Sequence, residues 1–246
     1  MREIAATVDP DEIRRFAARA EAWWDPEGSF RPLHRLNPTR LAFIRRHLVA
    51  HFGRASSSLR PFEGLSLMDV GCGGGLIAEP MTRLGFAVTG IDTGQEAISV
   101  ARAHAEAAGL RIDYRIETIE EAVDSRRRFN VILALEVIEH VADAAVFLRC
   151  LGPLVEPGGA FVGATLNRTA TSFALAVIGA EYLLGWLPRG THDWCKFMRP
   201  SELVLELRRN GFQVTQMAGV SYDLARGEWS LSRNLDVNYM VMATRP

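Results

Sequence analysis

The sequence predicts an α/β fold in which helices cover both faces of a doubly wound, mostly parallel sheet. From residue 65 onward, apolar runs of strand length alternate with segments of helical period, the pattern of a parallel sheet that is buried on both faces. A glycine-rich turn over 71–75 follows the first apolar run, and an acid, Asp92, closes the second. With 246 residues and 48% hydrophobic content, the chain is long enough for one full core with additions.

The strands are expected in a regular order along the chain. Five apolar runs are of strand length, near 65–70, 86–91, 112–116, 129–135 and 160–165. Two β-rich runs follow, over 212–217 and 239–244. The sequence therefore predicts seven strands.

Helix signals lie between these runs. A capping-box pattern that begins at Thr93 predicts a helix that Gly109 can end. Asp143 is a candidate N-cap for a helix that precedes the fifth strand. Pro200 begins a further helical pattern that runs through Arg209. These signals place a helix after each of the second, fourth and fifth strands.

The chain divides into an N-terminal extension and a core. Residues 1–64 are expected to form a helical lid, in which the adjacent Trp23 and Trp24 either dock on the main domain or cover its site. Residues 65–246 form the core, with a helical insertion at about 166–198. The apolar stretch 172–187 in that insertion is too short to span a bilayer as a helix. It either covers the core or meets a lipid-like substrate or a membrane surface.

Composition excludes several classes of protein. A formal net charge of −1 gives no general attraction to nucleic acid, so no nucleic-acid partner is expected. Three widely spaced cysteines form neither a disulfide framework nor a zinc-site pattern, which fits a reducing compartment. The acidic N-terminus has no early apolar run, which argues against a secretory or transit segment. We therefore expect a cytoplasmic protein.

The glycine turn and Asp92 predict a site for a nucleotide-like cofactor. Glycine adopts positive φ and lets bare backbone approach a ligand, so Gly71 and Gly73 are candidate cofactor contacts. The Asp92 carboxylate can accept both hydroxyl protons of a ribose. A dinucleotide fingerprint would require a small residue at position 76, which is Leu76, and the acid Asp69 would repel a pyrophosphate. A nicotinamide-dependent dehydrogenase is therefore disfavoured.

The end of the fourth strand carries two acids and an imidazole. If the chain turns helically after Leu135, then Glu136, Glu139 and His140 share one face and could hold a divalent cation such as Mg²⁺ or position a hydroxyl. The alternative is that His140 packs locally and one of the glutamates is solvated. Both interpretations place these side chains at the carboxyl edge of the sheet, where ligands bind in doubly wound folds.

Eight sequence segments together resemble one enzyme family. The turn with Asp69 at its head and glycines at alternate positions resembles motif I of class I S-adenosylmethionine-dependent methyltransferases. The whole set resembles the ubiquinone-biosynthesis O-methyltransferase family over nearly the full chain. The eight segments are WWD at 23–25, PLHRLNP at 32–38, DVGCGGG at 69–75, EVIEH at 136–140, TLNR at 165–168, GAEY at 179–182, GTHD at 190–193 and DVNYM at 236–240.

The resemblance implies a fold detail and a set of site residues. The last strand would insert antiparallel between the fifth and sixth strands. S-adenosylmethionine would contact Arg40, Gly71, Asp92 and Leu135, with the Arg40 guanidinium on the methionyl carboxylate. The cation-binding trio of mitochondrial relatives would correspond to Glu136, Glu139 and His140, which makes Mg²⁺ a candidate cofactor.

The resemblance also implies the reaction and its partners. The acceptors would be polyprenylated phenols and catechols, namely a 2-polyprenyl-6-hydroxyphenol and a 3-demethylubiquinol. His140 would accept the phenolic proton, or a bound cation would lower the pKa of the hydroxyl. Peripheral contact with the inner face of a bacterial membrane through 172–187 and association with other ubiquinone-biosynthesis proteins are expected. The alternatives are a methyltransferase for another small hydroxylated or carboxylated metabolite and a non-catalytic cofactor-binding scaffold of a lipid-biosynthetic assembly.

Overall fold

The computed structural model describes residues 7–10, 13, 22–175, 193–223 and 226–246. Most of the apolar stretch expected over 172–187, and the motifs at 179–182 and 190–192, therefore lie outside the described residues. Within the described part, no helix combines the length and apolar character that crossing a bilayer requires.

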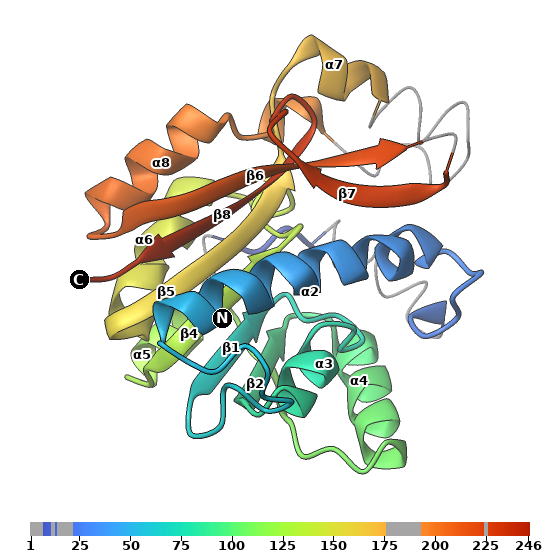
Figure 1. Ribbon diagram of the computed structural model, residues 1–246, viewed down its shortest axis with the longest axis vertical. Coiled ribbons are helices and arrows are strands. Elements are labelled where there is room, and N and C mark those ends of the chain that lie inside the picture. Colours follow the sequence, from blue (N-terminus) through green and yellow to red (C-terminus); the bar gives the residue numbers. More distant parts are fainter. Residues whose placement is uncertain (1–6, 11–12, 14–21, 176–192, 224–225) are drawn as a thin grey trace.

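One mixed sheet forms the centre of the molecule (Figure 1). Its strand order is β3-β2-β1-β4-β5-β8-β6-β7, with parallel pairing from β3 to β5 and antiparallel pairing beyond. The last strand lies antiparallel between β5 and β6, which confirms the order that the resemblance implied. The strands are β1 (Ser66–Val70), β2 (Ala87–Asp92), β3 (Asp113–Ile116), β4 (Phe129–Leu135), β5 (Val155–Leu166), β6 (Gln213–Asp223), β7 (Glu228–Ser232) and β8 (Asn238–Thr244).

An eighth strand, β7, extends the sheet beyond the seven that the sequence predicts. It pairs antiparallel with the second half of β6, with Gly219 opposite Ser232 and Asp223 opposite Glu228. The strand lies at the edge of the sheet and has only five residues, so the alternation of Trp229 and Leu231 with polar residues is too short to stand out in the sequence. This hairpin forms part of the site described below.

Helices cover both faces of the sheet (Figure 1). On one face, Phe43 of α2, Met81 of α3 and Ile98 of α4 belong to a single buried cluster with the strands. On the other face, side chains of α5, α6 and α8 form the second cluster. The helices are α2 (Arg31–His51), α3 (Ala78–Arg83), α4 (Gln95–Ala107), α5 (Ile119–Asp124), α6 (Ala144–Leu154), α7 (Ala170–Ser172) and α8 (Pro200–Arg209), with a 3₁₀ turn η3 (Trp194–Lys196).

Two of the three predicted helix starts are confirmed, and one predicted cap is wrong: α8 spans Pro200–Arg209 as expected. Asp143 caps α6, because its Oδ1 accepts hydrogen bonds from the N–H groups of Ala145 and Val146. The capping box predicted from Thr93 does not form: α4 begins after Gly94, which has no side chain to cap with. The Gly94 N–H instead donates to Asp92 Oδ1 at 2.8 Å. This hydrogen bond stabilises the end of β2 rather than the start of α4.

Two leucines of α8 provide a matched test of this packing. Leu207 is fully buried, whereas Leu205 is 49% exposed. Replacing Leu207 with alanine leaves a cavity and is expected to lower the free energy of unfolding by about 2–5 kcal/mol. Leu205→Ala is expected to cost less than about 1 kcal/mol in the same urea titration. Equal losses in the two variants would contradict the assignment of the buried face.

Candidate functional site

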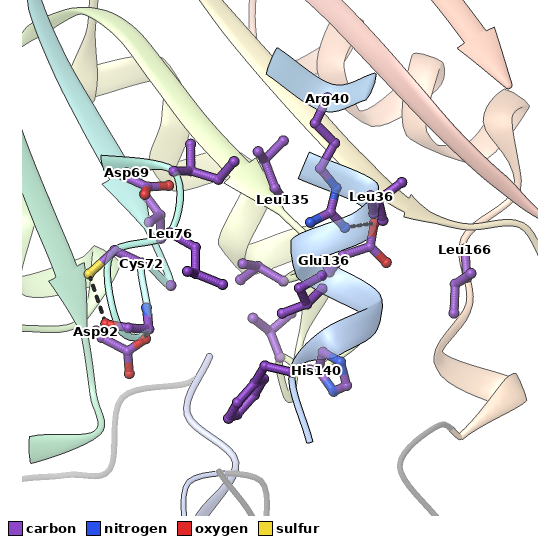
Figure 2. A pocket seen from close by; sticks show the side chains of 18 of the residues that line it. Leu36, Arg40, Asp69, Cys72, Leu76, Asp92, Leu135, Glu136, His140 and Leu166 are labelled. Atoms are coloured by element: carbon purple, nitrogen blue, oxygen red, sulfur yellow. Dashed lines mark hydrogen bonds and ion pairs between the residues drawn. The ribbon is translucent and has the colours of Figure 1, made fainter. Parts of the chain in front are cut away.

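A cavity of about 620 Å³ lies at the carboxyl ends of the central parallel strands, where doubly wound sheets bind ligands. The glycine turn after β1 and Asp92 at the end of β2 line one part of it, and His140 lies beyond the end of β4. Figure 2 shows Arg40 and Leu36 of α2 beside Glu136 in the same cavity. The structure therefore brings together Arg40, Gly71, Gly73, Asp92 and Leu135, all expected to contact the cofactor.

The glycine turn needs glycine for reasons of conformation and space. Gly71 and Gly73 have φ angles of 67° and 51°, in the left-handed region. A Cβ on Gly71 would lie 2.6 Å from a methyl group of Val137, and a Cβ on Gly73 would lie 2.4 Å from the ring of Trp23. Bare backbone therefore forms this part of the cavity wall.

Asp92 holds this turn in place. Its Oδ2 accepts a hydrogen bond from the Gly73 N–H at 2.9 Å, and its Oδ1 accepts one from Gly94 at 2.8 Å. Burial raises the pKa of Asp92, while hydrogen bonds from the backbone of Gly94, Gly73 and Thr93 oppose that shift. The carboxylate thus fixes the turn while lining the cavity.

Asp69, at the head of the turn, is a buried acid without a charge partner of its own. It is 3% exposed, and its Oδ2 has no hydrogen-bond partner among the described residues. Burial, and then the neighbouring Asp92, raise the pKa of Asp69 to about 7, while Arg40 opposes the shift. A buried carboxyl in this position is stabilised in its ionised form by a cationic ligand.

Arg40 is paired with Glu136 across the cavity. Its Nη2 lies 2.7 Å from Glu136 Oε1, and its Nη1 donates to Asn37 Oδ1 at 3.2 Å. Asn238 Nδ2 also donates to Glu136 Oε1, at 3.0 Å. Burial by itself would raise the pKa of Glu136, but Arg40 and these hydrogen bonds outweigh it and lower the pKa. Figure 2 shows the ion pair directly beside Leu36.

The structure does not gather Glu136, Glu139 and His140 on one face. Residues 136–140 form a turn rather than a helix, and Glu136 has a φ of 56°. Glu139 is buried, and its Oε2 accepts from Thr165 Oγ1 at 2.8 Å. In the described part of the chain, no three His, Cys, Asp or Glu side chains are grouped to hold a metal ion. The expected metal ligands therefore do not fit a metal site in this arrangement.

The pKa of Glu139 reflects its burial and its charged neighbours. Burial, and then the charge of Glu136, raise the pKa of Glu139 to about 8, and His140 opposes the shift. Glu139 Oε1 has no hydrogen-bond partner within the described chain. His140 lines the cavity itself, and its backbone N–H donates to Val137 O at 2.9 Å. Of Glu139 and His140, only His140 lines the cavity, so its side chain is the one that can contact a ligand.

Both tryptophans dock on the core, and Trp23 also lines the cavity. Trp23 stacks on Phe30 with ring centroids 3.8 Å apart, and its ring lies against Gly73 and Gly74. Trp24 Nε1 donates to Gly74 O at 2.9 Å. Both expected roles of the segment are therefore compatible with its position beside the glycine turn.

The far part of the cavity is apolar and was largely missed by sequence reasoning. Its wall comes from α2, the end of β5, the segment after α7 and the β6–β7 hairpin: Leu36, Leu166, Leu175, Val220, Tyr222, Trp229 and Val237. Asn37 and Asn238 were missed as well. Asn37 lies one helical turn before Arg40, and Asn238 lies in the motif at 236–240, so both had a sequence signal.

The comparisons with known proteins agree with this geometry. Residues 33–217 match the family model of a methyltransferase domain. Two solved structures of the magnesium protoporphyrin IX methyltransferase from Synechocystis PCC 6803 share the fold. The one with bound SAH has a TM-score of 0.65 at 17% identity, over 96% of this chain and 94% of that chain. The one with bound SAM has a TM-score of 0.64 at 13% identity, over 98% and 99%.

Curated relatives give the specific family. The ubiquinone biosynthesis O-methyltransferase of Paramagnetospirillum magneticum is 57% identical over 97% of this chain and 96% of its own. The protein of the same name from Azorhizobium caulinodans is 52% identical over 96% and 94%. Identity at this level over nearly the whole of both chains establishes the relationship. The chain therefore belongs to the ubiquinone biosynthesis O-methyltransferase family.

Proposed function

We propose that this protein transfers the methyl group of S-adenosylmethionine to a phenolic hydroxyl of polyprenylated intermediates of ubiquinone biosynthesis. The acceptors are a 2-polyprenyl-6-hydroxyphenol and a 3-demethylubiquinol. One observation carries the proposal: a single cavity joins the glycine turn and its two acids to an apolar chamber, with His140 also in its wall. That arrangement suits a charged methyl donor beside a hydrophobic phenol.

The polar part of the cavity is complementary to the methyl donor. S-adenosylmethionine supplies an electrophilic methyl group on a positively charged sulfonium. Asp92 is placed to accept hydrogen bonds from the ribose hydroxyls, and Asp69 to pair with the ammonium group. Arg40 binds the methionyl carboxylate of S-adenosylmethionine through its remaining donors, since the Arg40 Nε has no partner within the described residues. These contacts align the methyl group with the apolar chamber.

The acceptor hydroxyl must lose its proton as it attacks. A phenol has a pKa of about 10, so it needs a base at neutral pH. We assign that role to His140, which lines the cavity. The phenolic oxygen forms the new bond to the methyl carbon, the carbon–sulfur bond breaks, and His140 takes the proton. The enzyme mainly supplies alignment and proton removal.

The activity is tested by supplying both acceptors with S-adenosylmethionine that carries a labelled methyl group. We expect label in both methyl ethers, and a loss of kcat of about 100-fold or more in His140→Ala with unchanged affinity for S-adenosylhomocysteine. A matched arm repeats the assay after chelation and with added Mg²⁺, because a requirement for Mg²⁺ stays a prediction. Absence of transfer to either acceptor would contradict the proposed function, and unchanged turnover in His140→Ala would contradict the assigned base.

Asp69 predicts how cofactor affinity depends on pH. Burial raises the pKa of Asp69 to about 7, and pairing with an ammonium group requires the ionised form. The Kd for S-adenosylhomocysteine is therefore expected to rise about tenfold when the pH falls from 7.5 to 6. Asp69→Asn should bind more weakly at pH 7.5 and lose this dependence in calorimetry. Asp113→Asn, at a half-exposed aspartate on β3, should keep the wild-type profile; a pH dependence that persists in Asp69→Asn refutes the assignment.

We also propose peripheral membrane contact at the edge of the insertion. Phe173 and Leu175 are 43% and 56% exposed, and Leu175 also lines the cavity, so the apolar surface is continuous with the acceptor chamber. That continuity gives a prenylated substrate an apolar path from the bilayer. Association with other ubiquinone-biosynthesis proteins stays a prediction.

Vesicle flotation tests the membrane contact. Vesicles of phosphatidylethanolamine and phosphatidylglycerol should carry the wild-type protein, and the double variant Phe173→Ser/Leu175→Ser should bind at least about fivefold more weakly, because it removes two exposed apolar groups. Leu59→Ser is the matched control, since Leu59 is 88% exposed but does not line the cavity. Equal flotation of the wild type and the double variant would count against this contact.

A further inference from the structure

We propose that Trp23 is a cofactor-binding residue whose indole N–H donates a hydrogen bond to an oxygen atom of S-adenosylmethionine. The inference rests on the proposed function only in the identity of the cofactor. It assigns a specific role to one of the two adjacent tryptophans, with Trp24 as the anchor that positions it.

Trp23 has an unused donor next to the cofactor loop. Its side chain lines the cavity and is only 7% exposed. Its Nε1 is buried and has no hydrogen-bond partner among the described residues. Buried tryptophan N–H groups usually find an acceptor, and unpaired ones in native proteins call for an explanation. A ligand that binds in this cavity supplies the missing acceptor.

The ring is held so that this donor cannot turn away. Trp23 stacks on Phe30 with an interplanar angle of 8°. Its other neighbours are the backbones of Gly73 and Gly74, so close that an added Cβ would lie 2.4–2.5 Å from its ring. His34 Nε2 lies 2.8 Å from Trp23 O, which fixes the backbone at the same residue. The indole is therefore fixed in position before any ligand arrives.

Trp24 differs from Trp23 in that its polar atom is already paired. Its Nε1 donates to Gly74 O at 2.9 Å. Its ring stacks on His104 with centroids 3.4 Å apart, and His104 Nδ1 lies 2.5 Å from the buried Glu79. Trp24 thus joins the N-terminal segment to α3 and α4. The contrast leaves Trp23 as the member of the pair that has a donor available for the cofactor.

The position of Trp23 relative to Asp92 indicates which part of the cofactor it meets. Gly73 contacts both residues: its N–H donates to Asp92 Oδ2, and its α-carbon faces the Trp23 ring. Asp92 supplies only acceptors when it is ionised, so ribose hydroxyls that bind to it must act as the hydrogen-bond donors. A nearby N–H donor complements it, because a hydroxyl oxygen that donates to Asp92 can still accept.

The experiment compares Trp23→Phe with Trp24→Phe, each of which keeps a ring and removes one N–H. Titration calorimetry with S-adenosylhomocysteine is expected to show a Kd about five- to tenfold higher in Trp23→Phe, the typical effect of one lost hydrogen bond. Trp24→Phe should weaken binding by less. In ¹⁵N-labelled wild-type protein, the indole N–H signal of Trp23, assigned by its absence from Trp23→Phe, should move downfield when S-adenosylhomocysteine is added.

Each outcome bears on a distinct claim. Wild-type protein that fails to bind S-adenosylhomocysteine would contradict the proposed function itself. If the wild type binds but Trp23→Phe binds equally well, or both variants lose the same affinity, the hydrogen bond is refuted and the segment acts only as a cover. A Trp23 indole signal that stays in place on saturation refutes it as well.

Discussion

The cofactor side of the molecule depends on the hydrogen bonds that the Asp92 carboxylate accepts from Gly73 and Gly94. Four of the five residues of the turn are glycines, and the positive φ angles of Gly71, Gly73 and Gly75 are held by these bonds and by the residues around the turn. Because Asp92 ends β2 and the turn ends β1, the parallel pairing of the two strands sets the geometry. Trp23 can then pack on bare backbone only because the turn stays in place.

Carboxylates outnumber the cations at this site. Asp69, Asp92, Glu136 and Glu139 are all buried or lie at the cavity, whereas Arg40 is the cation that acts on Asp69 and Glu136. Burial, and then a neighbouring carboxylate, raises the pKa values of Asp69 and Glu139. A ligand with a sulfonium and an ammonium group brings the missing positive charge. The same electrostatics that cost stability in the free protein favour that ligand.

Most of the sheet could be predicted from the sequence because its signals are local. The runs that became β1, β2, β4 and the second half of β5 are largely apolar, as strands buried on both faces must be, whereas β3 carries Asp113 and Arg115 and buries only Tyr114. The first part of β6 was expected over 212–217, but β7 was missed, because its alternation of Trp229 and Leu231 with polar residues covers only five positions at the edge of the sheet. The position of β8 between β5 and β6 came from the family resemblance, because pairing order depends on contacts that no local pattern encodes.

The positions of the site residues could be predicted where they follow from backbone conformation. They could not be predicted where they depend on which side chains pair with one another. Gly71 and Asp92 occupy their expected places because each follows directly from a strand end. The shared face of Glu136, Glu139 and His140 was inferred from helical spacing, but the positive φ of Glu136 breaks that spacing at its first residue. Glu139 then turns to Thr165. The hydrogen-bond and ion-pair partners of a buried acid depend on tertiary contacts, which sequence spacing does not reveal.

Arg40 links the two halves of the cavity. Its Nη2 neutralises Glu136, which Asn238 also holds, while its Nε is left for a second acceptor. A carboxylate that arrives with the methyl donor must share the guanidinium with Glu136 or displace it. Either result changes the charge that Glu136 presents beside Glu139 and His140, because the three residues influence one another electrostatically. A carboxylate bound by Arg40 would therefore change the proton affinity of Glu139 through the charge of Glu136.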